Sequence, residues 1–234
     1  NILQNNYDGA RMDRFGSSWN PVKANAEQTD GPYRQLLRNR ARDLERNSDI
    51  AESVVAGVVR NSVGTGIRLQ SRIEDNSGAD MPELNNEIEE AWKRWCRARN
   101  CDVMGQSSFY EMQGIALRRR IVDGEMLFIK TYDRTARIPF KLQMVEADWL
   151  DISMTVNNET GNSIVSGIEV DSYGKPVAYW FTEQSVDGFS TFNSKRVTAD
   201  KVIHLFNKKR PSQVRGISEL AIVMQRIRDV GEYL

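Results

Sequence analysis

The sequence is poor in the side chains that catalytic and metal sites use. It contains one histidine, His204, and two cysteines, Cys96 and Cys101. The spacing of the cysteines fits no common zinc motif, and a pair of free thiols is typical of a reducing compartment. His204 lies within an apolar run, which favours a hydrogen-bonded core or interface histidine over a general acid or base. We therefore predict no catalytic residue, no metal site and no cofactor.

The chain also lacks a charge excess and a long apolar run. Its 234 residues carry 32 basic and 32 acidic side chains, so the formal net charge is zero. A general nucleic-acid binder normally has a basic excess, because much of its affinity comes from phosphate contacts. No apolar run approaches the roughly 18 residues of a membrane span. The length suits one large domain or two small ones, without a membrane partner.

Two pairs of carboxylates suggest metal chemistry. Asp123 and Glu125 flank a glycine, and Asp148 and Asp151 flank a Trp-Leu pair. Such carboxylates can hold Mg²⁺ in a nuclease. Turn and capping roles explain the same residues more simply. A metal-dependent nuclease therefore stays as an alternative function.

The first half of the chain has the hydrophobic period of helices. Apolar stripes predict helices over residues 31–46, 48–61, 82–99 and 109–120. Pro32 suits the first turn of the first helix, and Ser108 with Glu111 forms a capping box at the start of the last. Between the second and third helices, residues 67–73 alternate between apolar and polar side chains, which predicts a half-exposed strand.

From Asp123 onward the period changes to two, as in strands. Turn-forming residues separate several of the candidate strands. These candidates are residues 125–132, 140–146, 163–171, 177–183, 195–198 and 201–206. The first has apolar residues on both faces, so we expect it at the centre of a sheet. Helices followed by strands with short turns predict an α+β fold with a mostly antiparallel sheet.

The two ends of the chain differ from the rest. Residues 1–30 are polar, have no clean period and include aromatic residues such as Trp19, so we expect an extended arm there, although a flexible tail explains the pattern equally well. Residues 217–234 have an apolar stripe at helical spacing, with Ser218 as a plausible N-cap, and predict an amphipathic helix. Because the chain does not begin with Met and no clear capping signal ends this helix, we expect a fragment of a longer protein.

Several short motifs follow one another along the chain. Residues 201–234 contain a strand ending in IHLF, a basic loop RP-x-Q-x-RG-I-S, and a helix running on to a tyrosine. Further motifs are NSVGTGIRLQ (61–70), W-x-x-W (92–95), DGE (123–125) and GIE-x-D…G-x-P-x-AYW (167–180). In their order and spacing over nearly the whole chain, these motifs resemble the lambda-type family of tailed-bacteriophage portal proteins.

The resemblance implies the wing region of a portal subunit, an α+β unit that leads into a long stem helix. Its expected parts are an N-terminal arm (1–30), a helical part of the wing (31–122), an antiparallel β part of the wing (123–206), a basic loop (207–216) and the start of the stem helix (217–234). The clip, the second stem helix and the crown are expected beyond Leu234.

The resemblance also implies a structural protein rather than an enzyme. Portal subunits form a ring of about twelve copies at one capsid vertex, and double-stranded DNA passes through it during packaging and ejection. The implied partners are the terminase large subunit, the major capsid or scaffold protein and a head-tail adaptor. The implied location is the virion, after assembly in the bacterial host cytoplasm. Zero net charge fits a conduit, because many phosphate contacts would hold the DNA still.

The C-terminal end supplies the candidate contact residues. Between residues 207 and 228, six basic side chains stand against one acidic residue. This excess predicts a contact with DNA or with an acidic surface of a neighbouring subunit, while a solvated surface also explains it. The six are Lys208, Lys209, Arg210, Arg215, Arg226 and Arg228. Ile222 and Tyr233 lie opposite the main apolar stripe, so together with Trp19 they are candidate interface residues. A non-viral interaction module that pairs through this helix is a second alternative.

Overall fold

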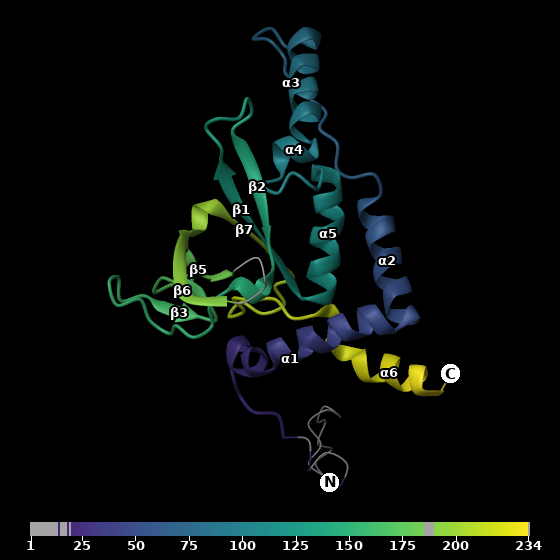
Figure 1. Cartoon of the computed structure of the whole chain (residues 1–234), viewed down its shortest axis with the longest axis vertical. Helices are drawn as coiled ribbons and strands as arrows, with labels where there is room; N and C mark the ends of the chain where they lie inside the picture. The colour runs from purple at the N-terminus through teal and green to yellow at the C-terminus, as the bar shows by residue number, and fades with distance from the viewer. Residues whose placement is uncertain (1–13, 15–17, 19, 185–189, 234) are drawn as a thin grey trace, which may run out of the picture.

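A computed structural model describes residues 14, 18, 20–184 and 190–233 of the chain. As predicted, the fold is α+β, with helices first and antiparallel strands after them (Figure 1). In this part of the chain, no helix is both long enough and apolar enough to cross a membrane.

Among the described residues, five helices precede the first strand. They are α1 (Ala26–Asn47), α2 (Asp49–Val63), α3 (Pro82–Trp95), α4 (Ala98–Cys101) and α5 (Phe109–Val122). Ser48 follows α1 and caps α2, where its side chain accepts a hydrogen bond from the N–H of Ala51. The predicted capping box of Ser108 and Glu111 is present at the start of α5.

The predicted start of the first helix was wrong. α1 begins at Ala26, because Asn25 and Gln28 form a capping box that the sequence analysis missed. Pro32 therefore lies inside the helix rather than in its first turn. The part of the expected arm from Ala26 onward is helical, and most of the arm before Asn20 lies outside the described residues.

The strand predicted at residues 67–73 was also wrong. These residues form no strand, although one edge of the stretch is hydrogen-bonded to side chains. The backbone N–H groups of Ile67, Ser71 and Ile73 donate hydrogen bonds to side chains rather than to another strand. The accepting side chains are those of Gln113, Glu89 and Asn85, respectively. Helix side chains thus take the place of a neighbouring strand.

In the part of the chain that the structure describes, two antiparallel sheets follow, with strand orders β2-β1-β7 and β3-β4-β5-β6. The strands are β1 (Glu125–Tyr132), β2 (Phe140–Val145), β3 (Ser163–Val165), β4 (Ile168–Val170), β5 (Pro176–Gln184), β6 (Ser190–Thr198) and β7 (Val202–Phe206). β1 is central in its sheet, as predicted. The single strand predicted at 163–171 is in fact two, because the chain reverses at Ser166 and Gly167, both with positive φ.

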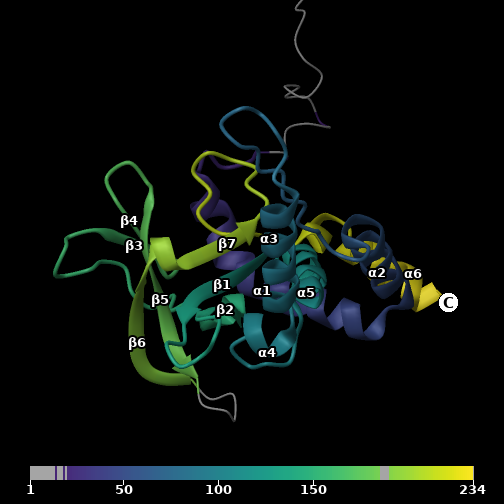
Figure 2. The same cartoon turned by 90° about the horizontal axis from the view of Figure 1, so that it is seen from above.

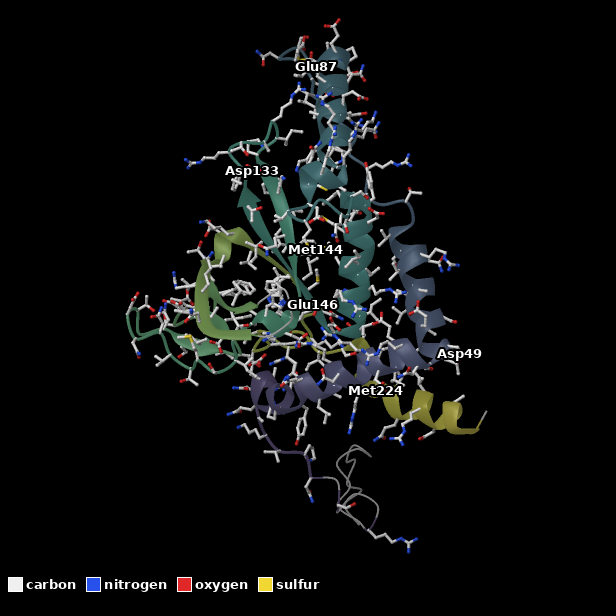
Figure 3. The ribbon with its side chains drawn as sticks, in the orientation of Figure 1. Asp49, Glu87, Asp133, Met144, Glu146 and Met224 are labelled. Carbon is white, nitrogen blue, oxygen red and sulfur yellow. The ribbon has the colours of Figure 1, made fainter. Side chains whose placement is uncertain are left out.

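Short 3₁₀ helices connect these elements, and one of them changes the expected C-terminal helix. They are η2 (Ala147–Trp149), η3 (Ala199–Lys201) and η4 (Glu219–Ile222). The helix predicted at 217–234 is η4 followed by α6 (Met224–Tyr233), and Ser218 caps η4 rather than α6. Leu220 and Met224 are buried, whereas Val230 is exposed, so the predicted apolar stripe is covered only near its start. Figure 3 shows Met224 where α6 begins below α1.

The elements form layers around three apolar clusters. One cluster lies between the two sheets and includes Leu127 and Ile168, and a second joins Trp95 and Met112 to the first sheet. The third packs α1, α2, α5 and the start of α6 together. Figure 1 shows α3 projecting from the body and α1 crossing the ends of α2 and α5. In Figure 2 the second sheet lies on the far side of the first sheet from α2 and α6.

Candidate functional site at the junction between β7 and α6

The loop of residues 207–216 connects β7 to η4 and is packed against the start of α1. Two backbone N–H groups of the loop, those of Val214 and Arg215, donate to Glu27 Oε1 at 3.0 and 3.2 Å. In return, the N–H of Ala26 donates to the Ser212 hydroxyl at 3.1 Å. The buried side chain of Gln213 also donates to the carbonyl of Arg215. The loop is therefore ordered by contacts with an element nearly two hundred residues away in the sequence.

A buried carboxylate, Glu125 at the start of β1, lies at the centre of this junction. It is 0% exposed and accepts hydrogen bonds from Arg38 Nη2 at 2.7 Å and from Arg215 Nε at 2.9 Å. The N–H of Gly216 donates to the same carboxylate at 3.0 Å, and His204 Nε2 lies 2.9 Å from it. Side chains from α1, β1, β7 and the loop therefore meet at one group.

The ion pairs continue from this centre along α1. Arg38 also donates to Asp148, and Arg42 donates to both carboxylate oxygens of Asp123. Arg34 pairs with Glu27 at 2.6 Å, and its Nε donates to the carbonyl of Gly216. Three arginines on one face of α1 thus tie this helix to the loop, to η2 and to the turn before β1.

The cationic side chains of the network keep its buried carboxyl groups ionised. Burial by itself raises the pKa of Glu125, but the Arg215 guanidinium and the hydrogen bond with His204 hold this pKa well below its usual range. Because Glu125 is therefore ionised, His204 donates to it through Nε2. Burial likewise opposes ionisation of Asp148, and Arg38 and Arg42 hold the pKa of this carboxyl below its usual value. The network is a set of charged pairs near neutral pH.

Two glycines permit the loop to cross the start of β1. Gly124 has a φ of +91°, and a Cβ built there would lie 2.3 Å from the backbone carbon of Ile217. A Cβ on Gly216 would lie 2.0 Å from the carbonyl oxygen of Gly124. Both distances are shorter than carbon contacts allow, so the two backbones approach as closely as they do because neither residue has a side chain.

The six basic residues singled out from the sequence differ in their burial. Arg215 is 1% exposed and belongs to the Glu125 network, so it is not available for contact with DNA or with another subunit. Lys209 pairs with Glu219, and Arg210 donates to the carbonyl of Ala24. The side chains that remain at the surface are Lys208, Lys209, Arg210, Arg226 and Arg228.

The candidate interface residues are described only in part. Ile222 is 88% exposed at the end of η4, on the surface as its place opposite the main stripe suggested. Trp19 and the side chain of Tyr233 lie outside the described residues. Whether these three residues contact another subunit stays a prediction.

The carboxylates considered for a metal site have other partners. Asp123, Glu125 and Asp148 are paired with arginines, and Asp151 accepts hydrogen bonds from Ser153 and Ser194. Within the described ranges, no group of three or more His, Cys, Asp or Glu side chains is arranged to hold a metal ion. These contacts favour a structural role for the carboxylates.

Most of the network could not be predicted from the sequence. Glu125 was expected to be a turn residue or a metal ligand, and no role was predicted for Glu27. One signal was available: the strand 125–132 begins with a carboxylate although its other residues have the pattern of a buried strand. A buried carboxylate requires a cationic partner. The basic residues of the strand 201–206 and of the basic loop were candidates for this partner.

Comparison with known proteins assigns the chain to a family. Residues 12–234 match the family described as phage portal protein, lambda family. The chain is also 29% identical over 239 residues to a probable portal protein of Halomonas phage phiHAP-1, an alignment that includes 99% of this chain. The chain spans 46% of that relative, about half its length. The match extends from before α1 through α6, and the chain therefore belongs to the lambda family of phage portal proteins.

Proposed function

We propose that the chain is the wing region and the start of the stem of a portal subunit. In this proposal the subunits form a ring at one capsid vertex, and double-stranded DNA passes through the ring during packaging and ejection. The observation that carries the proposal is the family match over residues 12–234. The terminase large subunit, the capsid or scaffold protein and a head-tail adaptor are the proposed partners of the whole protein, which acts as a structural component of the virion.

The junction supports a mechanical role for this region. α6 follows a loop that is tied to α1 and β1 through Glu125, so the direction in which the helix leaves the body is set by buried charged pairs. Breaking such a pair is costly, because it leaves a charge without a partner in a buried site. We infer that the network transmits force between the wing and the stem without letting the helix pivot.

The exposed basic side chains near this junction are the proposed contacts with DNA or with an adjacent subunit. Arg226 and Arg228 are exposed on α6, and Lys208 is exposed on the loop. Their number is small, which suits a channel in which the DNA must slide, since each phosphate contact adds to the binding free energy.

Ring formation is tested on the full-length protein that contains this chain. Native mass spectrometry and negative-stain microscopy should give a closed ring of about twelve copies with a central hole. A monomer or dimer at high protein concentration would refute the proposal and favour an interaction module.

The basic residues are tested by charge reversal. The double variant Arg226→Glu with Arg228→Glu should reduce DNA packaged into capsids or weaken ring assembly. The matched control, Arg134→Glu with Arg137→Glu, makes the same charge change at two exposed arginines in the turn between β1 and β2. If the ring mass and the amount of packaged DNA are the same for the two double variants, then Arg226 and Arg228 contact neither DNA nor an adjacent subunit.

A further inference from the structure

A hollow on the helical side of the molecule is lined mainly by apolar side chains. It measures about 700 Å³ and lies between the end of α2, helix α5 and the strand β7. Its α5 side includes Met112, Ala116 and Leu117. Ile67 and Leu205 also line it and are 73% and 38% exposed, respectively. Apolar side chains in this hollow are therefore left facing water in the single chain.

One charged side chain of the hollow lacks a counter-charge. Arg120 lines the hollow from α5, and its side chain forms no ion pair or hydrogen bond with the residues that the structure describes. Its charge acts on Glu219, but that carboxylate is already paired with Lys209 at 3.0 Å. A guanidinium binds carboxylates more strongly than neutral acceptors. The hollow therefore suits an apolar segment that carries an acidic side chain.

The loop of residues 150–162, between η2 and β3, has the complementary composition. Ile152 and Val156 are 62% and 46% exposed in this loop. Glu159 is also exposed, and it forms no ion pair with a described residue. The loop contains no lysine or arginine. It thus presents apolar side chains and an unpaired carboxylate to water.

A buried carboxylate holds this loop in shape. The side chains of Asn157, Thr160 and Asn162 all donate hydrogen bonds to Glu169, at 3.1, 3.1 and 2.9 Å, respectively. Glu169 is 0% exposed, so these bonds lie beneath the surface that the loop presents. A segment that is ordered before it binds loses less conformational entropy on binding than a flexible one. The loop is therefore preorganised for a contact.

The loop and the hollow lie on different sides of the molecule. The hollow is on the side of the first sheet that α5 covers, whereas the loop leads into β3 of the second sheet. Figures 1 and 2 both show the second sheet and its loops extending away from α2 and α5. A contact between two different surfaces of identical chains is heterologous, and repeated contacts of this kind can close into a ring.

We infer that the hollow of one subunit receives the loop 150–162 of a neighbouring copy of this chain. The inference rests on the proposed ring, in which every subunit has a neighbour on each side. Ile152 and Val156 cover the apolar side chains of the hollow, and Glu159 binds Arg120. The charges favour this occupant, because a neutral or basic segment would leave Arg120 without a counter-charge.

Photo-crosslinking on the full-length protein tests the inference. A benzophenone amino acid replaces Ile67 at the hollow, and in a control protein it replaces Met104, which is 66% exposed between α4 and α5. After irradiation, the position 67 protein should give a covalent dimer whose cross-linked peptide contains residues 150–162. The control protein should not give this peptide.

Charge reversal tests the pair of charges in the same assay. Arg120→Glu and Glu159→Arg should each lower the yield of the cross-linked dimer several-fold, because each places like charges together. The double variant restores opposite charges and should recover the yield. Glu83→Arg, at an exposed carboxylate on α3, makes the same charge change as Glu159→Arg and should leave the yield unchanged.

The other outcomes overturn the inference. A cross-link to residues 150–162 that stays in the monomer band would show that the chain fills its own hollow. A cross-link to another segment, or none, would show that the loop does not bind there. A double variant that does not recover the yield would show that Arg120 and Glu159 do not pair. Native mass spectrometry of the same samples separates the two proposals: a ring without the cross-link refutes this inference alone, whereas the absence of a ring refutes the proposed function as well.

Discussion

Replacing Glu125 by glutamine tests whether the buried carboxylate holds the junction together. Arg38 keeps its pair with Asp148, 2.9 Å away, when Glu125 loses its charge. Arg215 is 1% exposed, and its remaining acceptors among the described residues are the backbone carbonyls of Ser166 and Ala147. The variant therefore leaves one buried guanidinium without a counter-charge.

The expected loss of stability from Glu125→Gln is large. Removing one partner of a buried ion pair costs about 3–5 kcal/mol. The free energy of unfolding of a whole domain is typically about 5–15 kcal/mol. For a chain of this size, each kcal/mol lowers Tm by about 2–4 °C, so a fall of roughly 6–20 °C is expected.

Glu169→Gln is the matched control, because Glu169 is also 0% exposed. Its partner Arg196 is 31% exposed and can reach water when the carboxylate loses its charge. The loss should be about 1–3 kcal/mol, as for a buried hydrogen-bonded group that loses its partner's charge. The assay is urea unfolding followed by circular dichroism, with linear extrapolation of the free energy of unfolding to zero urea.

Equal losses for the two glutamine variants would refute the reasoning, because the burial of the partner guanidinium is what distinguishes them. If Glu125→Gln does not fold, the double variant with Arg215→Met removes the unpaired cation together with its partner. Replacing both members of a buried ion pair costs less than removing one. The double variant should therefore be more stable than the single variant.

Three further predictions concern pH, backbone space and helix capping. Hydrogen bonds from Arg196 and neighbouring side chains lower the pKa of Glu169 from 4.5 to about 2. The stabilisation of the fold by this carboxylate should therefore be complete above about pH 4.5 and lost as the pH falls toward 2. A urea midpoint that is constant over this pH window would contradict the prediction. Gly124→Ala should lower Tm far more than Gly174→Ala, because the added Cβ meets backbone at 2.3 Å in the first case and nothing within 4 Å in the second; similar Tm values would be inconsistent with the close crossing. Asn25→Ala should cost about 1 kcal/mol and speed amide exchange at the start of α1, whereas Asn25→Ser should keep the cap; equal exchange in both variants would exclude the capping role.

Much of the fold follows from local patterns in the sequence. The change of hydrophobic period at Asp123 separates helices from strands, and Ser108 with Glu111 marks a helix start. The strand prediction for residues 67–73 was wrong because helix side chains, rather than a neighbouring strand, accept hydrogen bonds from alternate N–H groups of this stretch. The expected C-terminal helix is interrupted at Val223, between η4 and α6, and Leu220 and Met224 on either side of the break belong to the same cluster.

The class of fold, the order of most elements and the resemblance that the family match confirmed could be predicted from the sequence, because these depend on residues close together in the chain. Tertiary structure alone decided that Glu125, Arg38, Arg215 and His204 meet at one point, since each partner lies 79 to 90 positions from Glu125. It also decided that Arg215 is buried while Arg226 is exposed, although both belong to the same basic excess. The packing of distant elements, rather than any local pattern, sets which charges are paired.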